Sequence, residues 1–339
     1  MEKTTVLVTA IGSFSADCVI RELKSMGHRV IGTDIYEKNW IPASKDVDRF
    51  VQVPLSSEEE KYIEVLTALC REEGVRYLFP LTDLEVDALN RHRRVFDAAG
   101  VCLCMSGEEE IILLRDKLEL SLKVGGILNG IADPKLKGNV RIIPSRRAAD
   151  IDFENVTYPL VLKPVNGRSS SGLYRIFQED QLGFAFSNIC DPDKLNDTAL
   201  ENYIVQPLIK GHVVTVDVLR DSKGHCTAVP REELLRTPNG AGLSVRVFQD
   251  SALTEACRQI AAGLNILGCV NFEFIRGEGS GVYYFIECNP RFSGGVAFTE
   301  LAGVPMVSGA LRCFAGEEIR EDVTPLCGYM TKKYVECRM

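Results

Sequence analysis

The sequence lacks the features of two large classes of protein. No apolar run is long enough to cross a bilayer, so we expect no membrane partner. The formal net charge of -8 is spread over many acidic and basic residues without a basic stripe, which argues against nucleic-acid binding. The apolar content of 45% and the charged content of 25% are typical of a folded, water-soluble chain.

Several short motifs are also missing. The 12 cysteines form no zinc-type CxxC pairs, and the chain begins on a strand pattern without a signal peptide, which predicts reduced thiols and a cytoplasmic location. The dinucleotide fingerprint GxGxxG is absent because Gly12 stands alone in the first turn, so we reject a nicotinamide enzyme. The Walker A pattern GxxxxGK[ST] does not occur either.

The first hundred residues alternate between strand and helix patterns. Apolar strand patterns occupy 5–9, 29–34, 75–81 and 101–105, and helical patterns occupy 13–26, 58–73 and 83–98. This alternation predicts a parallel sheet with helices on both faces. Ligands of such sheets bind at the carboxyl ends of the strands, which here carry Gly12, Ser13, Asp34, Thr82 and Asp83. Asp34 is equally explained as a turn former.

Two glutamates late in the chain are predicted to face each other. Residues 268–275 (GCVNFEFI) and the start of 282–295 (VYYFIECNPRFSGG) read as strands, and the glycine-rich segment 276–281 can fold one back beside the other. Strand alternation puts Glu273 on the face of Asn271, and Glu287 on the face of Tyr283, Phe285 and Asn289. Adjacent carboxylates repel unless a cation such as Mg²⁺ lies between them. Solvated or ion-paired glutamates are the alternative.

A glycine- and serine-rich loop follows an earlier predicted strand. Lys163 precedes Pro164, which favours extended backbone at the lysine. Residues 166–172 (NGRSSSG) then supply backbone N–H groups, hydroxyls and a guanidinium that can surround oxyanions. A flexible hairpin between strands 160–164 and 173–177 explains the same composition.

The order of these features resembles the ATP-grasp superfamily, in particular the synthetase units of carbamoyl phosphate synthase. The resemblance covers the whole chain. It implies an α/β fold with a Rossmann-like parallel-sheet N-terminal (pre-ATP-grasp) domain at 1–110, followed by an α+β ATP-grasp domain. That second domain would consist of a lid subdomain at 111–202 and a C-terminal nucleotide- and metal-binding subdomain at 203–339. The motifs that carry the resemblance are Asp116-Lys117, Leu162-Lys163-Pro164 with its loop, Gln206, Glu273 and the ECNPR segment 287–291.

The resemblance also implies a role for each matching residue. The lid over the phosphates would consist of Gly167, Arg168, Ser169, Ser170, Ser171 and Gly172, and the adenine slot of Gln206, Pro207, Leu208 and Ile209. Lys117 and Lys163 would bind the phosphates, Arg291 the transferring phosphoryl group, and Glu273, Glu287 and Asn289 would bind Mg²⁺ or Mn²⁺. His212 stands where relatives usually carry an acidic residue for the ribose; it is either a substitute or simply packed or exposed.

The resemblance implies an ATP-dependent carboxylate-amine ligase. Such an enzyme forms an acyl phosphate and releases ADP and phosphate, with a small-molecule carboxylate and an amine as substrates. Two alternatives are activation of bicarbonate or carbamate, as in carbamoyl phosphate synthase, and a non-catalytic ATP-binding module. For a soluble enzyme a homodimer is the commonest assembly.

Overall fold

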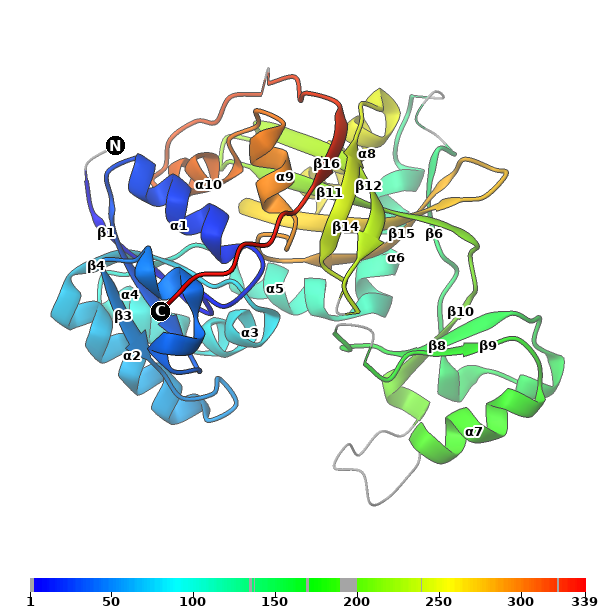
Figure 1. The fold of residues 1–339 in the computed structure, drawn as a ribbon. Helices are drawn as coiled ribbons and strands as arrows, with labels where there is room; N and C mark the ends of the chain where they lie inside the picture. The colour runs from blue at the N-terminus through cyan, green and yellow to red at the C-terminus, as the bar shows by residue number, and fades with distance from the viewer. Residues whose placement is uncertain are drawn as a thin grey trace.

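The described residues form three β-sheets (Figure 1), and the α/β class predicted from the sequence is confirmed. The computed structural model describes residues 3–133, 136, 138–168, 171–189, 200–238, 240–321 and 323–339. Within these residues no helix is both long and apolar enough to cross a membrane. The cysteines among them are all free thiols.

The N-terminal sheet is parallel, with strand order β3-β2-β1-β4-β5. Its strands are β1 (Thr5–Val8), β2 (Arg29–Asp34), β3 (Arg49–Gln52), β4 (Val75–Phe79) and β5 (Cys102–Leu103). Its helices are α1 (Ala16–Ser25), α2 (Glu59–Glu73), α3 (Asp83–Arg91) and α4 (Arg93–Ala98), with 3-10 turns at Lys38–Trp40 and Pro42–Lys45. Successive side chains of β1 point to opposite faces of the sheet, and helices cover both faces. Val6 and Val8 pack in the core that contains α1, and Leu7 packs in the core that contains α2 and α3.

The helical segment that follows the N-terminal sheet is interrupted at Asp116. Helix α5 (Glu108–Arg115) ends there, and α6 (Lys117–Asn129) begins at the next residue. Asp116 adopts extended backbone angles, and its carboxylate accepts hydrogen bonds from the amides of Leu118 and Glu119 at 2.9 Å each. This N-cap satisfies amide groups that have no partner inside the helix, and it places Lys117 at the first position of α6.

The small sheet is antiparallel, with order β7-β10-β8-β9. Its strands are β7 (Arg146–Arg147), β8 (Leu160–Pro164), β9 (Tyr174–Ile176) and β10 (Tyr203–Pro207), packed on α7 (Asp180–Ile189), with 3-10 turns at Ala148–Asp150, Phe153–Asn155 and Leu200–Asn202. Because β10 pairs with β8, it belongs to the small sheet, although the expected division placed residue 203 in the C-terminal subdomain. The division into 1–110, 111–202 and 203–339 stays a proposal.

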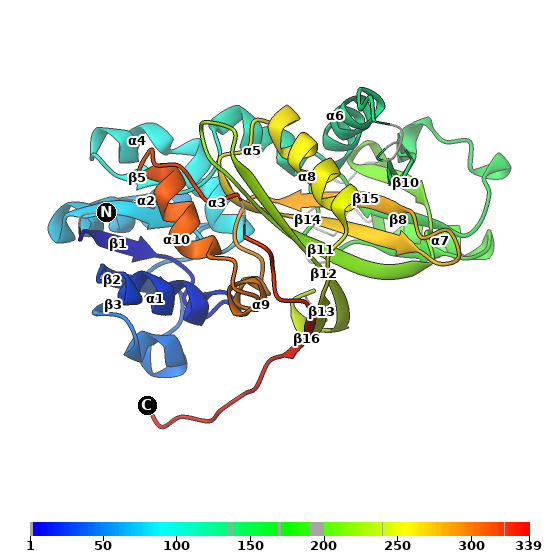
Figure 2. The same cartoon turned by 90° about the horizontal axis from the view of Figure 1, so that it is seen from above.

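The large sheet has seven strands in the order β16-β13-β12-β11-β14-β15-β6. The strands are β6 (Val140–Ile142), β11 (Gly211–Arg220), β12 (Cys226–Arg236), β13 (Gly242–Val247), β14 (Gly268–Gly277), β15 (Tyr283–Asn289) and β16 (Gly328–Thr331). Helix α8 (Ser251–Gly263) packs with α6 on one face, as Figure 2 shows. Helices α9 (Val296–Leu301) and α10 (Met306–Phe314) lie between this sheet and the N-terminal sheet.

Candidate functional site

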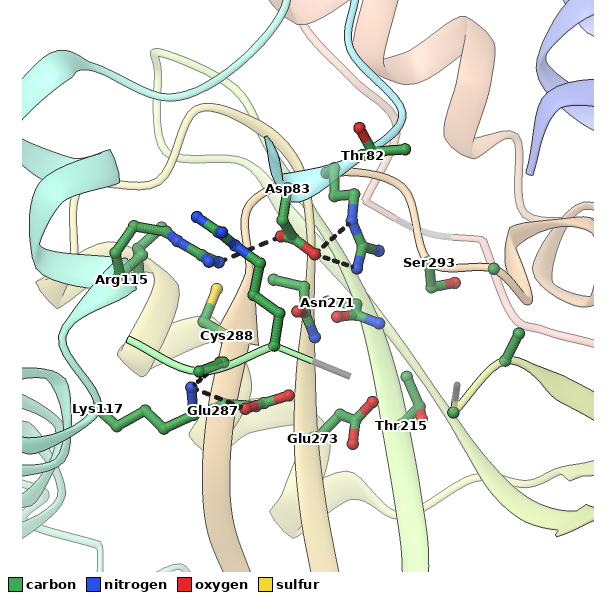
Figure 3. A pocket seen from close by; sticks show the side chains of 18 of the residues that line it. Thr82, Asp83, Arg115, Lys117, Thr215, Asn271, Glu273, Glu287, Cys288 and Ser293 are labelled. Carbon is green, nitrogen blue, oxygen red and sulfur yellow. Dashed lines mark hydrogen bonds and ion pairs between the residues drawn. The ribbon is translucent and has the colours of Figure 1, made fainter. Parts of the chain in front are cut away.

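A cavity of about 1130 Å³ lies where the three sheets approach one another. The turns after β1 and β4 line one side, the loop after β8 lines another, and polar side chains of β11, β12, β14 and β15 line the rest (Figure 3). Nine predicted site residues line it: Lys117, Gly167, Arg168, Ser171, Gly172, Glu273, Glu287, Asn289 and Arg291. Segments far apart in the sequence therefore contribute to one cavity.

The two glutamates are cross-strand neighbours, as their strand patterns predict. In the β14–β15 register Glu273 lies opposite Glu287, and Asn271 lies opposite Asn289. Thr215 of β11 lies opposite Glu273 on its other side. All five side chains line the cavity, so its floor is a patch of oxygen and amide groups on one face of the sheet.

The face predicted for the first half of β15 is wrong. Tyr283 and Phe285 were expected beside Glu287, but both are buried in the core with Phe272 and Phe274. The register shifts between the pairs Glu273–Glu287 and Phe274–Phe285, which leaves Ile286 without a partner. A bulge of this kind reverses the alternation of side chains, so the apolar residues face the core while Glu287 faces the cavity.

Two lysines lie near the carboxylates. The Lys117 amine is 3.6 Å from Glu287 Oε2 and also donates a hydrogen bond to the Gly167 carbonyl. Lys163 is buried in β8. Its burial lowers the pKa of Lys163 to about 8, although the charge of Glu287 acts in the opposite direction. The charges of Glu273, Glu287 and Lys117 act on the Lys163 amine. Lys163 is nevertheless not among the described residues that line the cavity.

The glutamate pair fits a hard cation. Burial raises the pKa of Glu273, the charge of Glu287 adds to the effect, and Arg236, which donates to Glu273 Oε1 at 2.9 Å, opposes it. A cation between the carboxylates would remove the cost of placing two negative charges together. No group of three or more His, Cys, Asp or Glu side chains suited to a metal is found among the described residues. Asn289 also lines the cavity, and its side-chain oxygen is a further candidate ligand. Carboxylate and amide oxygens suit Mg²⁺.

Arg291 is engaged by an aspartate that comes from the N-terminal sheet. Its Nε and Nη2 donate to Asp83 Oδ2 at 3.1 and 2.6 Å. Arg115 approaches Asp83 Oδ1 at 3.3 Å (Figure 3). It also lies 3.2 Å from Asp87, which pairs with Arg168 as well. Burial acts to raise the pKa of Asp83, but the charges of Arg291 and Arg115 outweigh it and hold that pKa below its usual value.

Sequence reasoning missed most of this ion-pair network. Asp83 could be singled out because it follows a strand of the parallel sheet. Arg115 and Asp87 lie inside helices and carry no local pattern that would distinguish them from surface charges.

A second buried charge cluster surrounds Arg231, which is 1% exposed. Its guanidinium donates to Asp217 at 2.5 Å, to Glu233 at 3.1 Å and to Ser293 at 2.9 Å. Gly242 allows this packing, because a Cβ there would lie 2.2 Å from Glu233 Oε2. Arg246 is not among the described residues that line the cavity; it pairs with Glu232 at 2.7 Å.

The predicted adenine slot lies outside the described lining of this cavity. Gln206 is buried and donates to Ser145 at 2.7 Å, and the Leu208 amide donates to the Pro159 carbonyl at 3.0 Å. His212 is exposed on β11. Pro207 and Ile209 of the predicted adenine slot are likewise not among the described lining residues. Ser169 and Ser170 of the predicted lid lie outside the described residues. The roles of these residues stay predictions.

Comparison with known proteins agrees with this architecture. Residues 199–336 match the family described as ATP-grasp in the biosynthetic pathway with Ter operon, and residues 6–104 match the PylC-like N-terminal domain. Together with the three-sheet fold, these matches confirm the class predicted from the motifs. The family matches, the carbamoyl phosphate synthase relatives and the fold support an ATP-grasp superfamily protein.

Individual relatives are distant. The carbamoyl phosphate synthase large chain of Clostridium botulinum (strain Alaska E43 / Type E3) is 26% identical over 179 residues, which is 50% of this chain but only 16% of the relative. A biotin carboxylase from Campylobacter jejuni superposes with a TM-score of 0.77 at 18% identity, covering 96% of this chain and 74% of that one. An L-amino acid ligase from Bacillus licheniformis superposes with a TM-score of 0.68 at 17% identity, covering 96% and 78%. The two structural likenesses show the fold alone.

Proposed function

We propose that this protein is an ATP-dependent ligase that joins a small-molecule carboxylate to an amine through an acyl phosphate, releasing ADP and phosphate. One observation carries the proposal: Glu273 and Glu287 face each other in a cavity that also contains Lys117 and Arg291. The ATP-grasp family match and the resemblance to an L-amino acid ligase fold support it. We place the activity in the cytoplasm, where free thiols persist, and we expect a homodimer.

Each proposed role follows from charge. Lys117 and Lys163 bind the phosphates of ATP, with the adenine held at 206–209 and the ribose near His212. Glu273, Glu287 and Asn289 hold Mg²⁺, which when bound offsets the negative charge of the phosphates. The loop from Gly167 to Gly172 covers the triphosphate within the proposed lid. Arg291 stabilises the charge that develops on the transferring phosphoryl group.

The chemistry has two steps. First, an oxygen of the substrate carboxylate attacks the γ-phosphorus, and the bond from that phosphorus to ADP breaks. Two anions meet in this step, so the cationic side chains must offset their repulsion. Next, the amine nitrogen attacks the acyl carbon, the carbon–oxygen bond breaks, and phosphate leaves as the amine loses a proton. A closed site protects the acyl phosphate from water.

Activation of bicarbonate is the second candidate. The observation that favours it is the similarity to carbamoyl phosphate synthase large chains and to a biotin carboxylase fold. The match spans less than a fifth of the length of the carbamoyl phosphate synthase large chain reported above. ADP release that depends on bicarbonate and needs no other carboxylate would favour this reaction over the ligase.

The ligase proposal is tested with purified protein, Mg-ATP and pools of amino acids and other carboxylates and amines. We expect ADP and phosphate to form only when both a carboxylate and an amine are present, with the joined product found by mass spectrometry. Glu287→Gln serves as the inactive control. Tight Mg-ATP binding without phosphate release for any acceptor would instead indicate a non-catalytic nucleotide-binding module.

A further inference from the structure

The guanidinium of Arg291 is partly used by contacts inside the protein. An arginine side chain has five N–H donors. Asp83 Oδ2 accepts one from Nε and one from Nη2, and the Phe292 carbonyl accepts one from Nη1 at 3.1 Å. Three of the five donors are thus occupied, and the described part of the chain offers no acceptor for the second N–H of Nη1 or the second N–H of Nη2. Two free N–H groups on neighbouring nitrogens suit the paired oxygens of a phosphoryl group.

The contact between Asp83 and Arg291 joins separate parts of the fold. Asp83 is the first residue of α3, directly beyond the carboxyl end of β4 in the N-terminal sheet, whereas Arg291 lies in the turn after β15 of the large sheet. Both side chains are largely enclosed, with 12% and 20% of their surfaces exposed. An ion pair with little exposure is screened less by water and salt than a surface pair.

Arg291 has competing partners in the same cavity. Its charge acts on Glu273, whose carboxylate faces Glu287. A guanidinium without a fixed partner would be attracted to these carboxylates, which the proposed function assigns to the metal. Asp83 supplies a carboxylate on another wall of the cavity, and Arg115, at 3.3 Å from Asp83, helps to fix it there (Figure 3).

We propose that Asp83 is a positioning residue for Arg291: it holds the guanidinium away from Glu273 and Glu287, with two N–H groups free for the transferring phosphoryl group. The inference rests on the proposed function, because that function assigns the phosphoryl contact to Arg291. In this proposal Asp83 contacts neither substrate nor metal. Asp83 therefore affects the reaction only through Arg291, and a double-mutant cycle can test this.

The test compares binding of ADP alone with binding of ADP plus orthovanadate, which mimics the transferring phosphoryl group, by calorimetry in the presence of Mg²⁺. This readout needs no knowledge of the carboxylate or amine. We expect Asp83→Asn to bind ADP with an affinity within about twofold of that of wild type. The factor by which vanadate increases this affinity should be about 10- to 100-fold smaller than in wild type. Asp83→Glu, which keeps the charge on a longer side chain, should restore part of it.

A double-mutant cycle separates positioning from a general structural role. In an Arg291→Ala background, adding Asp83→Asn should change the vanadate-dependent tightening no further, because its only route has already been removed. Glu59→Gln, which breaks an ion pair with Arg91 elsewhere in the N-terminal domain, is the matched control and should behave as wild type. Thermal unfolding with ADP checks that every variant is folded.

The outcomes distinguish the two proposals. If Asp83→Asn keeps the full tightening, or if the two substitutions add independently, the positioning role is overturned while the proposed function stands. If wild-type protein binds no ADP, or shows no tightening with vanadate, the proposed phosphoryl site fails, and the role of Asp83 fails with it.

Discussion

Glu287 has a central proposed role, although its side chain is only partly buried. Its side chain is 28% exposed, and the Lys117 amine lies 3.6 Å from its Oε2 atom. We expect Glu287→Gln to lower the rate of ADP release by at least about 100-fold, because the cation loses a charged ligand. The free energy of unfolding should change by no more than about 1 kcal/mol. Near-normal turnover at saturating Mg²⁺ would contradict the metal assignment, and urea denaturation provides the stability measurement.

Lys163 should make nucleotide binding depend on pH. Because its pKa is lowered to about 8, the amine is charged below that pH and becomes neutral above it. A phosphate favours the charged amine, so the affinity for Mg-ATP should fall as the pH rises through about 8. Calorimetric titration of wild-type protein between neutral and alkaline pH measures this dependence.

Lys163→Met should bind Mg-ATP weakly at every pH and should lack the decline above pH 8. Lys223→Met is the control, because this exposed lysine pairs with Glu318 far from the cavity and should leave the profile unchanged. Unaltered affinity in Lys163→Met would remove this lysine from the phosphate site.

Some residues of the candidate site can be recognised from their neighbours in the sequence, and others cannot. Glu287 and Arg291 belong to one short segment, and Lys117 and the glycine loop belong to others, so each could be named from its neighbours in sequence. Asp87 and Arg115 could not, because their importance depends only on which surfaces the fold brings together. A helical aspartate or arginine is ordinarily a solvated charge.

At the scale of the element, β15 shows how one unpaired residue changes a strand. With strict alternation Phe285 and Glu287 would lie on the same face of the sheet. Either Glu287 would then be buried in the core or Phe285 would face the cavity. The bulge at Ile286 resolves this conflict, since it places Phe285 in the core and Glu287 in the cavity. The strand itself could be predicted from its β-branched and aromatic residues. The bulge could not, because it is set by pairing with β14 and not by the sequence of β15 alone.

This assignment of faces predicts unequal stability effects along the strand. Phe285 is 2% exposed, and its ring lies edge-on to Phe272 and Phe274, with centroids 5.8 and 5.5 Å away. We expect Phe285→Ala to lower the free energy of unfolding by about 3–5 kcal/mol. Ile286→Ala removes a partly exposed side chain at the unpaired position and should cost less than about 2 kcal/mol.

Denaturation in urea measures both losses. The comparison is matched, because the two substitutions are adjacent and remove apolar side chains from the same strand. A larger loss at Ile286 than at Phe285 would show that the strand does not carry the bulge described here.

At the scale of the whole molecule, the cavity depends on all three sheets. The parallel N-terminal sheet contributes the turns after β1 and β4, the small sheet contributes the loop after β8, and the large sheet contributes the carboxylates. The order of strand and helix patterns predicts the parallel sheet, because its connections are local. The assignment of β10 to the small sheet and the pairing of β16 with β13 are set by contacts between distant segments, which local patterns do not encode.

The same distinction applies to the ends of the expected subdomains. The expected lid subdomain at 111–202 includes β6, yet β6 pairs with β15 of the large sheet, and the local sequence does not show this pairing. Hydrogen bonding between strands decides such membership.

The most direct measurement is a crystal structure with Mn²⁺ and a non-hydrolysable ATP analogue, with the metal located by its anomalous signal. The account predicts an anomalous peak between Glu273 and Glu287, in contact with Asn289 and with the phosphates of the analogue, and with Lys117 on the phosphates. A metal and triphosphate bound elsewhere, with the two glutamates contacting neither, would contradict it.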